Sequence, residues 1–149
     1  MTKLDREQAI ADNVAYVERV VADVRTRYRP RDTLVFSGFS QGGAMAYRAA
    51  AHIPSQGLII LASDVPPDVA ALRPRSGQAG PRVTLPRLLI GRGSGDEWYT
   101  EEKQAADTAA LDALGTSYEL CVFDGAHEWT EAFRAAAAGF LRTTREFTR

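Results

Sequence analysis

Hydrophobic side chains are spaced along this chain in two ways, and the two spacings predict different elements. Between residues 5 and 28 apolar positions recur every three or four residues with charges between them, which predicts an amphipathic helix. Asp5 and Gln8 at its start resemble a capping box. Short continuous apolar runs elsewhere predict buried strands. These runs cover residues 33–37, 57–62, 85–90 and 118–123.

The segments between the strands predict helices. The alanine-rich residues 41–52 form one helix, which ends before Pro54 because proline cannot continue the hydrogen bonding. Thr100 can cap a second helix that runs to about Leu114, and Gly115 follows it where a left-handed terminating residue is needed.

The remaining segments complete an alternating order of strands and helices. A helical turn is predicted near residues 67–72, a loop with prolines and glycines over 73–82, and a closing helix from 128 to about 147. This alternation predicts a three-layer α/β/α fold around a mostly parallel, doubly wound sheet. Ligands are then expected at the carboxyl ends of the strands.

Composition narrows the class of protein. The 149 residues are 45% hydrophobic and 25% charged, which is typical of one globular domain, predicted to span residues 1–149. A net charge of -1 offers no basic field for nucleic acid, and no apolar run approaches the roughly 20 residues of a membrane helix. The amino terminus lacks the apolar core of a secretory signal, so a cytoplasmic location is predicted.

Metal and disulfide chemistry find little support in the sequence. The single cysteine, Cys121, excludes an intrachain disulfide and a cysteine-based metal cluster. Two histidines do not favour a histidine-rich zinc site, so no metal is predicted. Cys121 alternates with its neighbours in a predicted strand, and we expect it to pack as a small hydrophobe.

Residues 38–42, Gly-Phe-Ser-Gln-Gly, stand between a predicted strand and a predicted helix. A G-x-S-x-G pattern in that context predicts a nucleophile elbow, in which the chain reverses tightly around Ser40. Gly38, Gly42 and Gly43 supply the small residues that such a turn needs. The alternative is a phosphate-binding helix start, which is disfavoured because no lysine follows as in a phosphate loop.

Partners for Ser40 follow later in the chain. Asp96 comes after the apolar run at 88–90, and His127 comes after the run at 120–123. The order Ser, Asp, His is that of α/β-hydrolases, whereas other serine hydrolases reach the same geometry with other orders. We therefore predict a triad of these three residues, with Ser40 as nucleophile, His127 as base and Asp96 as acid.

Other residues compete for two of these roles. Asp64, after the strand at 57–62, and Asp124, three residues before His127, are rival acids that rank behind Asp96. The other histidine, His52, is expected at the carboxyl end of the helix that follows the elbow, where a cation needs no catalytic explanation.

A family resemblance rests on these motifs. Residues 38–43, the Gly93-x-x-Asp96 loop and Gly125-x-His127 together resemble the phospholipase/carboxylesterase branch of the α/β-hydrolases, which includes acyl-protein thioesterase-like enzymes. The likeness runs from about Asp5 to Leu141. It implies a serine hydrolase that cleaves a carboxylic ester or thioester through an acyl-enzyme, without a cofactor. Family members carry about one third more chain ahead of the helix that precedes the elbow strand, including a loop with an oxyanion donor.

Further site residues are expected around the triad. The backbone N–H of Gln41, directly after the nucleophile, is the expected oxyanion donor within this chain. Trp98, Tyr99 and Trp129 lie beside the acid and base loops, where they either line the substrate pocket or pack the loops down.

The predicted strand at 33–37 also has a second implication. In the family this strand is central, whereas here no strand is predicted before it, so it forms an open edge that invites association. A homodimer paired through this edge is therefore expected as one form of the protein. The alternative function is that of a truncated, catalytically impaired hydrolase that acts, if at all, as such an oligomer.

Overall fold

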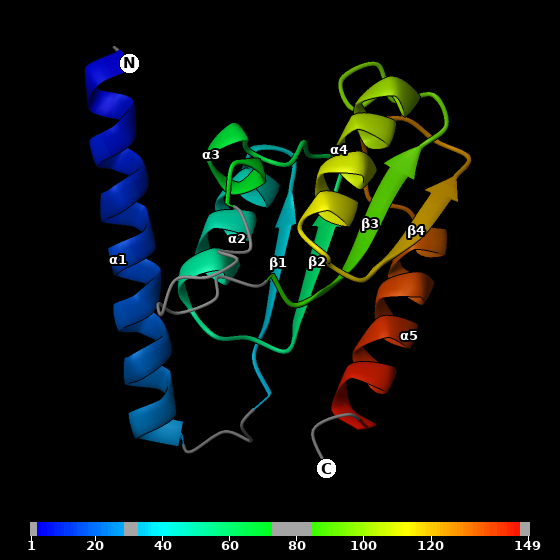
Figure 1. Cartoon of the computed structure of the whole chain (residues 1–149). Coiled ribbons are helices and arrows are strands. Elements are labelled where there is room, and N and C mark those ends of the chain that lie inside the picture. The colour runs from blue at the N-terminus through cyan, green and yellow to red at the C-terminus, as the bar shows by residue number, and fades with distance from the viewer. Residues whose placement is uncertain (1–2, 29–32, 73–84, 147–149) are drawn as a thin grey trace.

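Four parallel strands form one sheet in the computed structural model, which describes residues 3–28, 33–72 and 85–146 (Figure 1). The strands pair in chain order, as β1 Val35–Phe39, β2 Gly57–Leu61, β3 Arg87–Gly93 and β4 Tyr118–Phe123. The register sets Phe39 beside Leu61 and Gly93 beside Phe123. All four strands thus end at one edge of the sheet, and the predicted α/β fold with a parallel sheet is confirmed.

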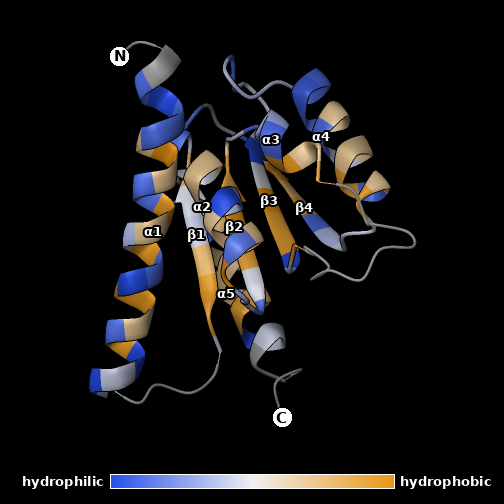
Figure 2. Ribbon diagram, turned by 60° about the vertical axis from the view of Figure 1, so that its left-hand side comes forward, coloured by the Kyte–Doolittle hydropathy of each residue, from blue (hydrophilic) through white to orange (hydrophobic). Residues whose placement is uncertain are grey.

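Helices cover both faces of this sheet (Figures 1 and 2). Helix α2 packs on β1 and β2 with α1 against its outer side, whereas α5 packs on β2, β3 and β4 from the opposite face. Helix α4 lies on the same face as α2 (Figure 1). The bounds are α1 Lys3–Tyr28, α2 Gln41–His52, α3 Pro67–Ala70, α4 Glu101–Ala113 and α5 Glu131–Glu146.

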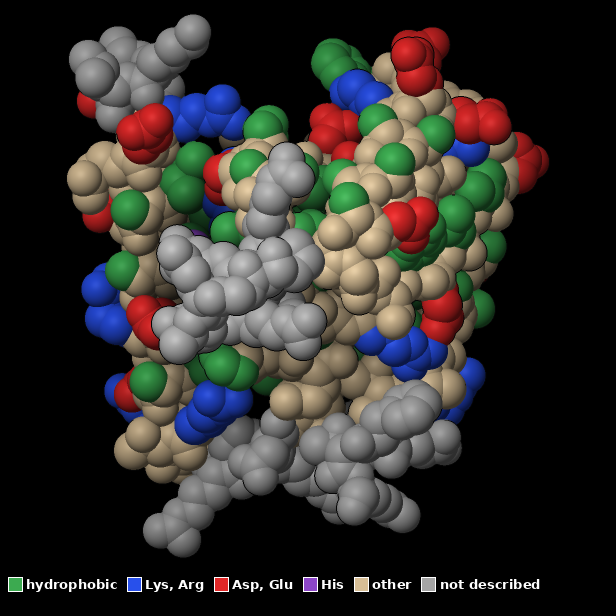
Figure 3. All heavy atoms as spheres, viewed as in Figure 1, with side chains coloured by type: hydrophobic (Ala, Val, Ile, Leu, Met, Phe, Trp, Pro, Cys, Tyr) green, Lys and Arg blue, Asp and Glu red, His purple; other side chains and the backbone are tan. Residues whose placement is uncertain are grey.

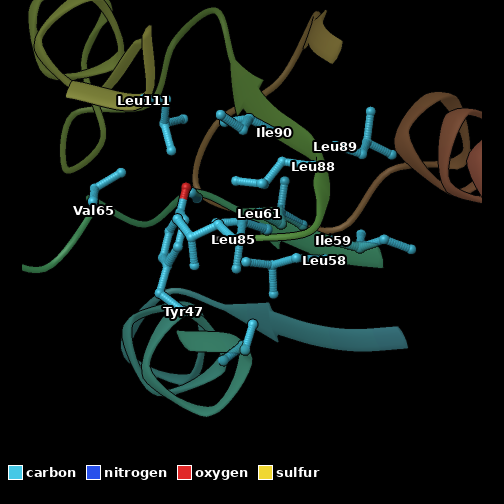
Figure 4. Packing of buried hydrophobic residues seen from close by; sticks show 14 of the residues in the cluster. Tyr47, Leu58, Ile59, Leu61, Val65, Leu85, Leu88, Leu89, Ile90 and Leu111 are labelled. Atoms are coloured by element: carbon cyan, nitrogen blue, oxygen red, sulfur yellow. The ribbon is translucent and has the colours of Figure 1, made fainter. Parts of the chain in front are cut away.

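The core explains why the central strands are continuously apolar. Figure 4 shows Tyr47 of α2 and Leu111 of α4 on one side of β2 and β3, while Ile59 and Leu89 point toward the opposite side. Successive strand residues face opposite sides of a sheet, so a sheet covered on both faces needs apolar residues at every position. Leu58 and Leu88, like Tyr47 and Leu111, have no exposed surface.

Several predicted boundaries shift in the structure. Strand β1 lies two residues later than predicted, so that Ser40 follows it directly, and α5 begins three residues later than predicted. Strand β3 extends to Gly93 because residues 91–93 pair with 121–123 of β4, a contact between distant segments that local sequence does not show. The predicted loop at 73–82 lies outside the described residues.

The helix ends test the predicted caps. The capping box at Asp5 is wrong, because α1 begins at Lys3 and the Gln8 side chain donates to Asp12 at 2.8 Å instead. The cap at Thr100 is confirmed, since its hydroxyl accepts the N–H of Lys103. Gly115 has the predicted left-handed backbone, with a φ of 67°.

The outer surface agrees with the balanced composition. Figure 3 shows basic and acidic side chains interspersed over the face that carries α1, α2 and α4. Among the helices within the described ranges, none is long and apolar enough to cross a membrane. Strand β1 is at an edge of the sheet and pairs with β2 alone among the described strands, as the sequence predicted.

Candidate active site

Ser40 stands at the tight reversal between β1 and α2. Its backbone has a φ of 51° and a ψ of -126°, a conformation that residues with a side chain rarely adopt. The Ser40 N–H donates to the carbonyl of Leu61 at 2.9 Å, which ties the reversal to the end of β2. Strained backbone of this kind is held only where the surroundings fix it, and it clusters at functional sites.

Two of the three predicted elbow glycines are required by close contacts. A Cβ on Gly38 would lie 2.4 Å from the carbonyl oxygen of Gly42, and one on Gly43 would lie 2.5 Å from the Cβ of Ser63. The prediction for Gly42 itself is wrong, because a Cβ there would meet nothing within 4 Å. The tight turn therefore has no room for a side chain at Gly38 or Gly43, whereas it has room for one at Gly42.

The loops after β3 and β4 bring Asp96 and His127 together. His127 Nδ1 lies 2.9 Å from Asp96 Oδ2 and 3.2 Å from Asp96 Oδ1. An ionised carboxylate only accepts hydrogen bonds, so Nδ1 carries the proton in this pair. The Asp96 side chain is fully buried, whereas the His127 side chain is 24% exposed.

The surroundings of Asp96 keep it ionised. Burial works to raise the pKa of this carboxyl, but the backbone N–H groups of Tyr99 and Trp98 and the contact with His127 outweigh burial, so the pKa is lowered. Both N–H groups donate to Asp96 Oδ1, at 2.9 Å and 2.8 Å. The arrangement can hold the imidazole in one tautomer and stabilise its cation.

The rival residues do not take part in the contact between Asp96 and His127. Asp64 pairs with Lys103, with 3.3 Å between Oδ2 and Nζ, and Asp124 is exposed. His52 ends α2, the helix that Gln41 begins beside Ser40, so it stands at the far end of that helix. The structure thus brings Asp96, and neither rival acid, to His127.

Ser40 and His127 both line a pocket of about 290 Å³ at the carboxyl ends of the strands. Trp98 and Tyr99 also line it, although Trp98 is 73% exposed. Trp129 is not part of its lining and packs on Phe39 and Phe133, with ring centroids 6.4 Å and 5.1 Å away. The other lining residues are Arg6, Gln41, Ala44, Arg48, Ala62, Ser63, Asp64, Val65, Pro66, Pro67 and Lys103.

Gln41 occupies the position expected for an oxyanion donor. It is the first residue of α2, and the first N–H groups of a helix have no partner within that helix. Gln41 also lines the pocket beside Ser40. Its backbone N–H is thus available in the region where negative charge would develop on a bound substrate, and the helix dipole favours that charge.

Two pocket features were missed by reasoning from the sequence. Ala62, directly after β2, is a second non-glycine residue with positive φ, at 52°. Arg48 is 5% exposed and binds both oxygens of Asp68, at 2.7 Å and 2.8 Å. The sequence held a signal for the buried Arg48, since an arginine stands within the alanine-rich segment at 41–52. It held none for the positive φ of Ala62, because an alanine does not mark such a backbone.

The described residues offer no metal centre. Within residues 3–28, 33–72 and 85–146, no group of three or more His, Cys, Asp or Glu side chains is placed to hold an ion. Cys121 is half-buried and packs against the core, where burial raises the pKa of its thiol. A raised pKa disfavours the reactive thiolate.

Comparison of the sequence with known protein families identifies one that matches this chain. The sequence model of the family described as Phospholipase/Carboxylesterase matches residues 1–145. No curated protein matches the chain in sequence.

Solved structures share the fold at low sequence identity. SOBER1 of Arabidopsis thaliana superimposes with a TM-score of 0.71 at 18% identity, covering 91% of this chain and 65% of its own. The Bacillus cereus carboxylesterase superimposes with a TM-score of 0.71 at 15% identity, covering 93% of this chain and 63% of its own. Esterase PE8 superimposes with a TM-score of 0.68 at 22% identity, covering 86% of this chain and 58% of its own. The chain thus spans less than two thirds of the length of each of these proteins.

Proposed function

The chain belongs to the phospholipase/carboxylesterase family, and from this premise we propose that it is a serine hydrolase that cleaves a carboxylic ester or thioester. The observation that carries the proposal is the contact of 2.9 Å between His127 and Asp96, on a histidine that shares a pocket with Ser40. Family membership supports a hydrolase, and this contact favours the serine mechanism.

In the proposed reaction Ser40 Oγ attacks the carbonyl carbon of the substrate. His127 takes the serine proton on Nε2, because its Nδ1 is engaged by Asp96. Asp96 stabilises the imidazolium, which then gives the proton to the leaving alcohol or thiol. Water repeats the sequence on the acyl-enzyme and releases the acid.

The tetrahedral intermediate needs donors for its oxyanion. The Gln41 N–H is the donor we assign within the described chain. Loss of one donor from a pair typically lowers kcat by about 10²- to 10³-fold. If the Gln41 N–H acts alone, acylation and deacylation of Ser40 are both slowed, because each passes through an oxyanion intermediate.

The pocket favours a small acyl group. Its volume of about 290 Å³ is at the lower limit of ligand pockets, which are typically about 300 to 1,000 Å³. Trp98, which is 73% exposed, gives it an aromatic wall against which a short or medium acyl chain can pack.

Hydrolysis of p-nitrophenyl esters of increasing acyl length, beside a matching thioester, tests this function. We expect a burst of p-nitrophenol equal to the enzyme concentration, and its loss in Ser40→Ala. Ser63→Ala is the matched control, because Ser63 lines the same pocket. Hydrolysis that survives Ser40→Ala, or folded protein that hydrolyses none of these esters, would refute the proposal.

A second candidate function follows from the edge position of β1. We propose as the alternative that the chain has little activity and associates through this edge as a homodimer. Sedimentation analysis combined with the burst assay separates the two. A dimer without a burst supports the alternative, whereas a monomer with a burst supports the hydrolase.

A further inference from the structure

The carboxylate of Asp96 is oriented by the backbone that follows it. Its Oδ1 accepts the N–H groups of Trp98 and Tyr99, at 2.8 Å and 2.9 Å. The same carboxylate contacts His127 Nδ1 through both oxygens. A shift of residues 98–99 would therefore turn the carboxylate relative to the imidazole.

Helix α4 holds these residues at two points that lie one helical turn apart. Lys103 Nζ donates to the carbonyl of Trp98 at 2.7 Å, and the Tyr99 hydroxyl donates to Asp107 Oδ2 at 2.9 Å. Tyr99 is 1% exposed and Asp107 is 7% exposed. The second contact is thus shielded from water, where a hydrogen bond is electrostatically stronger than at the surface.

The same two side chains of α4 reach the loop after β2. Lys103 Nζ also contacts Asp64 Oδ2 at 3.3 Å, and the Asp107 carboxylate accepts the backbone N–H of Val65. Asp64 and Val65 line the pocket together with Ser40. Helix α4 therefore joins the turn that carries Asp96 to another wall of the pocket.

We propose that Tyr99 and Asp107 are positioning residues, which fix the turn at 96–99 so that the Asp96 carboxylate meets His127. The inference rests on the proposed function, because it takes Asp96 as the acid of the triad. Tyr99, which the sequence predicted either to line the pocket or to pack the loops, then acts through Asp96, and its hydroxyl is occupied by Asp107.

A purely structural role does not account for a carboxyl at this place. Burial raises the pKa of Asp107 to about 6, so its charged form opposes folding at neutral pH. Replacement of buried charged groups by well-packed apolar ones is often neutral or stabilising. A hydrogen-bond acceptor for the Tyr99 hydroxyl, in contrast, is what a positioning role requires.

The test compares variants that remove or keep this hydrogen bond. Tyr99→Phe and Asp107→Ala remove it, whereas Asp107→Asn keeps an acceptor. Tyr118→Phe is the matched control, because the Tyr118 hydroxyl bonds Asp112, another carboxylate of α4, and Tyr118 does not line the pocket. The measurements are kcat and KM for a p-nitrophenyl ester, and the NMR signal of the His127 Nδ1 proton, which the bond to Asp96 shifts to low field and protects from exchange.

We expect Tyr99→Phe and Asp107→Ala to lower kcat by about tenfold or more with little change in KM, since small misplacements of catalytic groups cost this much. The Nδ1 proton should exchange faster in both, while Asp107→Asn and Tyr118→Phe resemble the wild type. Unchanged kcat and proton signal in Tyr99→Phe would overturn the proposal, as would equal losses in Tyr118→Phe. If the wild type hydrolyses no ester, the proposed function fails, and the proton signal alone decides the positioning role.

Discussion

The proposed nucleophile, Ser40, and the proposed acid, Asp96, are held in place by different means. Ser40 is fixed through its backbone, by a positive φ, one hydrogen bond to Leu61 and the close contact at Gly38. Asp96 is fixed through its side chain, by two backbone N–H groups and the imidazole of His127. The strained turn tolerates no added carbon at Gly38, whereas the hydrogen-bonded carboxylate tolerates no lost acceptor. The two sides of the site should therefore fail under different substitutions.

The largest effect is expected from removing charge on the acid side. Asp96→Asn keeps the shape of the side chain but favours the wrong tautomer of His127, and such a change lowers kcat by about 10⁴-fold in a serine protease triad. Asp64→Asn, which alters an exposed ion pair with Lys103, is the control and should retain activity. Steady-state kinetics on one ester measures both variants. Equal losses in the two would mean that Asp96 has no special role.

The next effect is expected from adding a methyl group on the nucleophile side. Gly38→Ala places a Cβ against the Gly42 carbonyl and should destabilise the fold by about 3 kcal/mol. Gly42→Ala has open space and should raise stability by up to about 1 kcal/mol, because alanine favours a helix. Urea unfolding measures both. If Gly38→Ala proved as stable as the wild type, the elbow would not be closed as described.

An effect of comparable size concerns the dependence of stability on pH, where two buried carboxyls act in opposite directions. Because the pKa of Asp96 is lowered in the folded chain, this carboxylate stabilises the fold at pH values above its usual pKa of 3.8. The contribution is lost as pH falls through the pKa that Asp96 has in the folded chain. The pKa of Asp107 is raised to about 6, so the folded chain keeps a proton that the unfolded chain has lost. The contribution of Asp107 to stability is complete below about pH 3.8 and declines as pH rises to about 6.

Asp107→Asn isolates the second contribution. Between about pH 4 and about pH 7 the free energy of unfolding of the wild type should fall by roughly 3 kcal/mol relative to that of this variant. Urea unfolding at the two pH values measures the difference. A constant difference between the proteins would show that folding does not raise the pKa of Asp107.

The smallest effect separates the two tryptophans beside the site. Trp98→Ala removes an exposed pocket wall and should raise KM by about threefold to tenfold, since an exposed aromatic contributes about 1 kcal/mol. Trp129→Ala, which removes a ring packed on Phe39 and Phe133, should lower stability more than it raises KM. The reverse result would place the substrate against Trp129.

Local sequence signals predicted this site unevenly. The glycines around Ser40 and the positions of Asp96 and His127 after apolar runs placed these residues at the carboxyl ends of strands, because strand ends and tight turns have local signatures. The bond between Tyr99 and Asp107 joins a loop to a helix of mixed alanine and polar residues, in which no local pattern marks Asp107 as a buried side chain. The positive φ of Ala62 and the extension of β3 depend on tertiary pairing, which no local pattern encodes.

Covalent labelling with a fluorophosphonate probe shows whether Ser40 is a nucleophile activated by His127. The purified wild type, Ser40→Ala and His127→Ala are treated with the probe, with circular dichroism to show that each is folded and mass spectrometry to locate the adduct. One adduct on Ser40 is expected in the wild type and none in either variant. Folded wild-type protein that takes up no probe, or that is labelled at another residue, would mean that Ser40 is not the activated nucleophile.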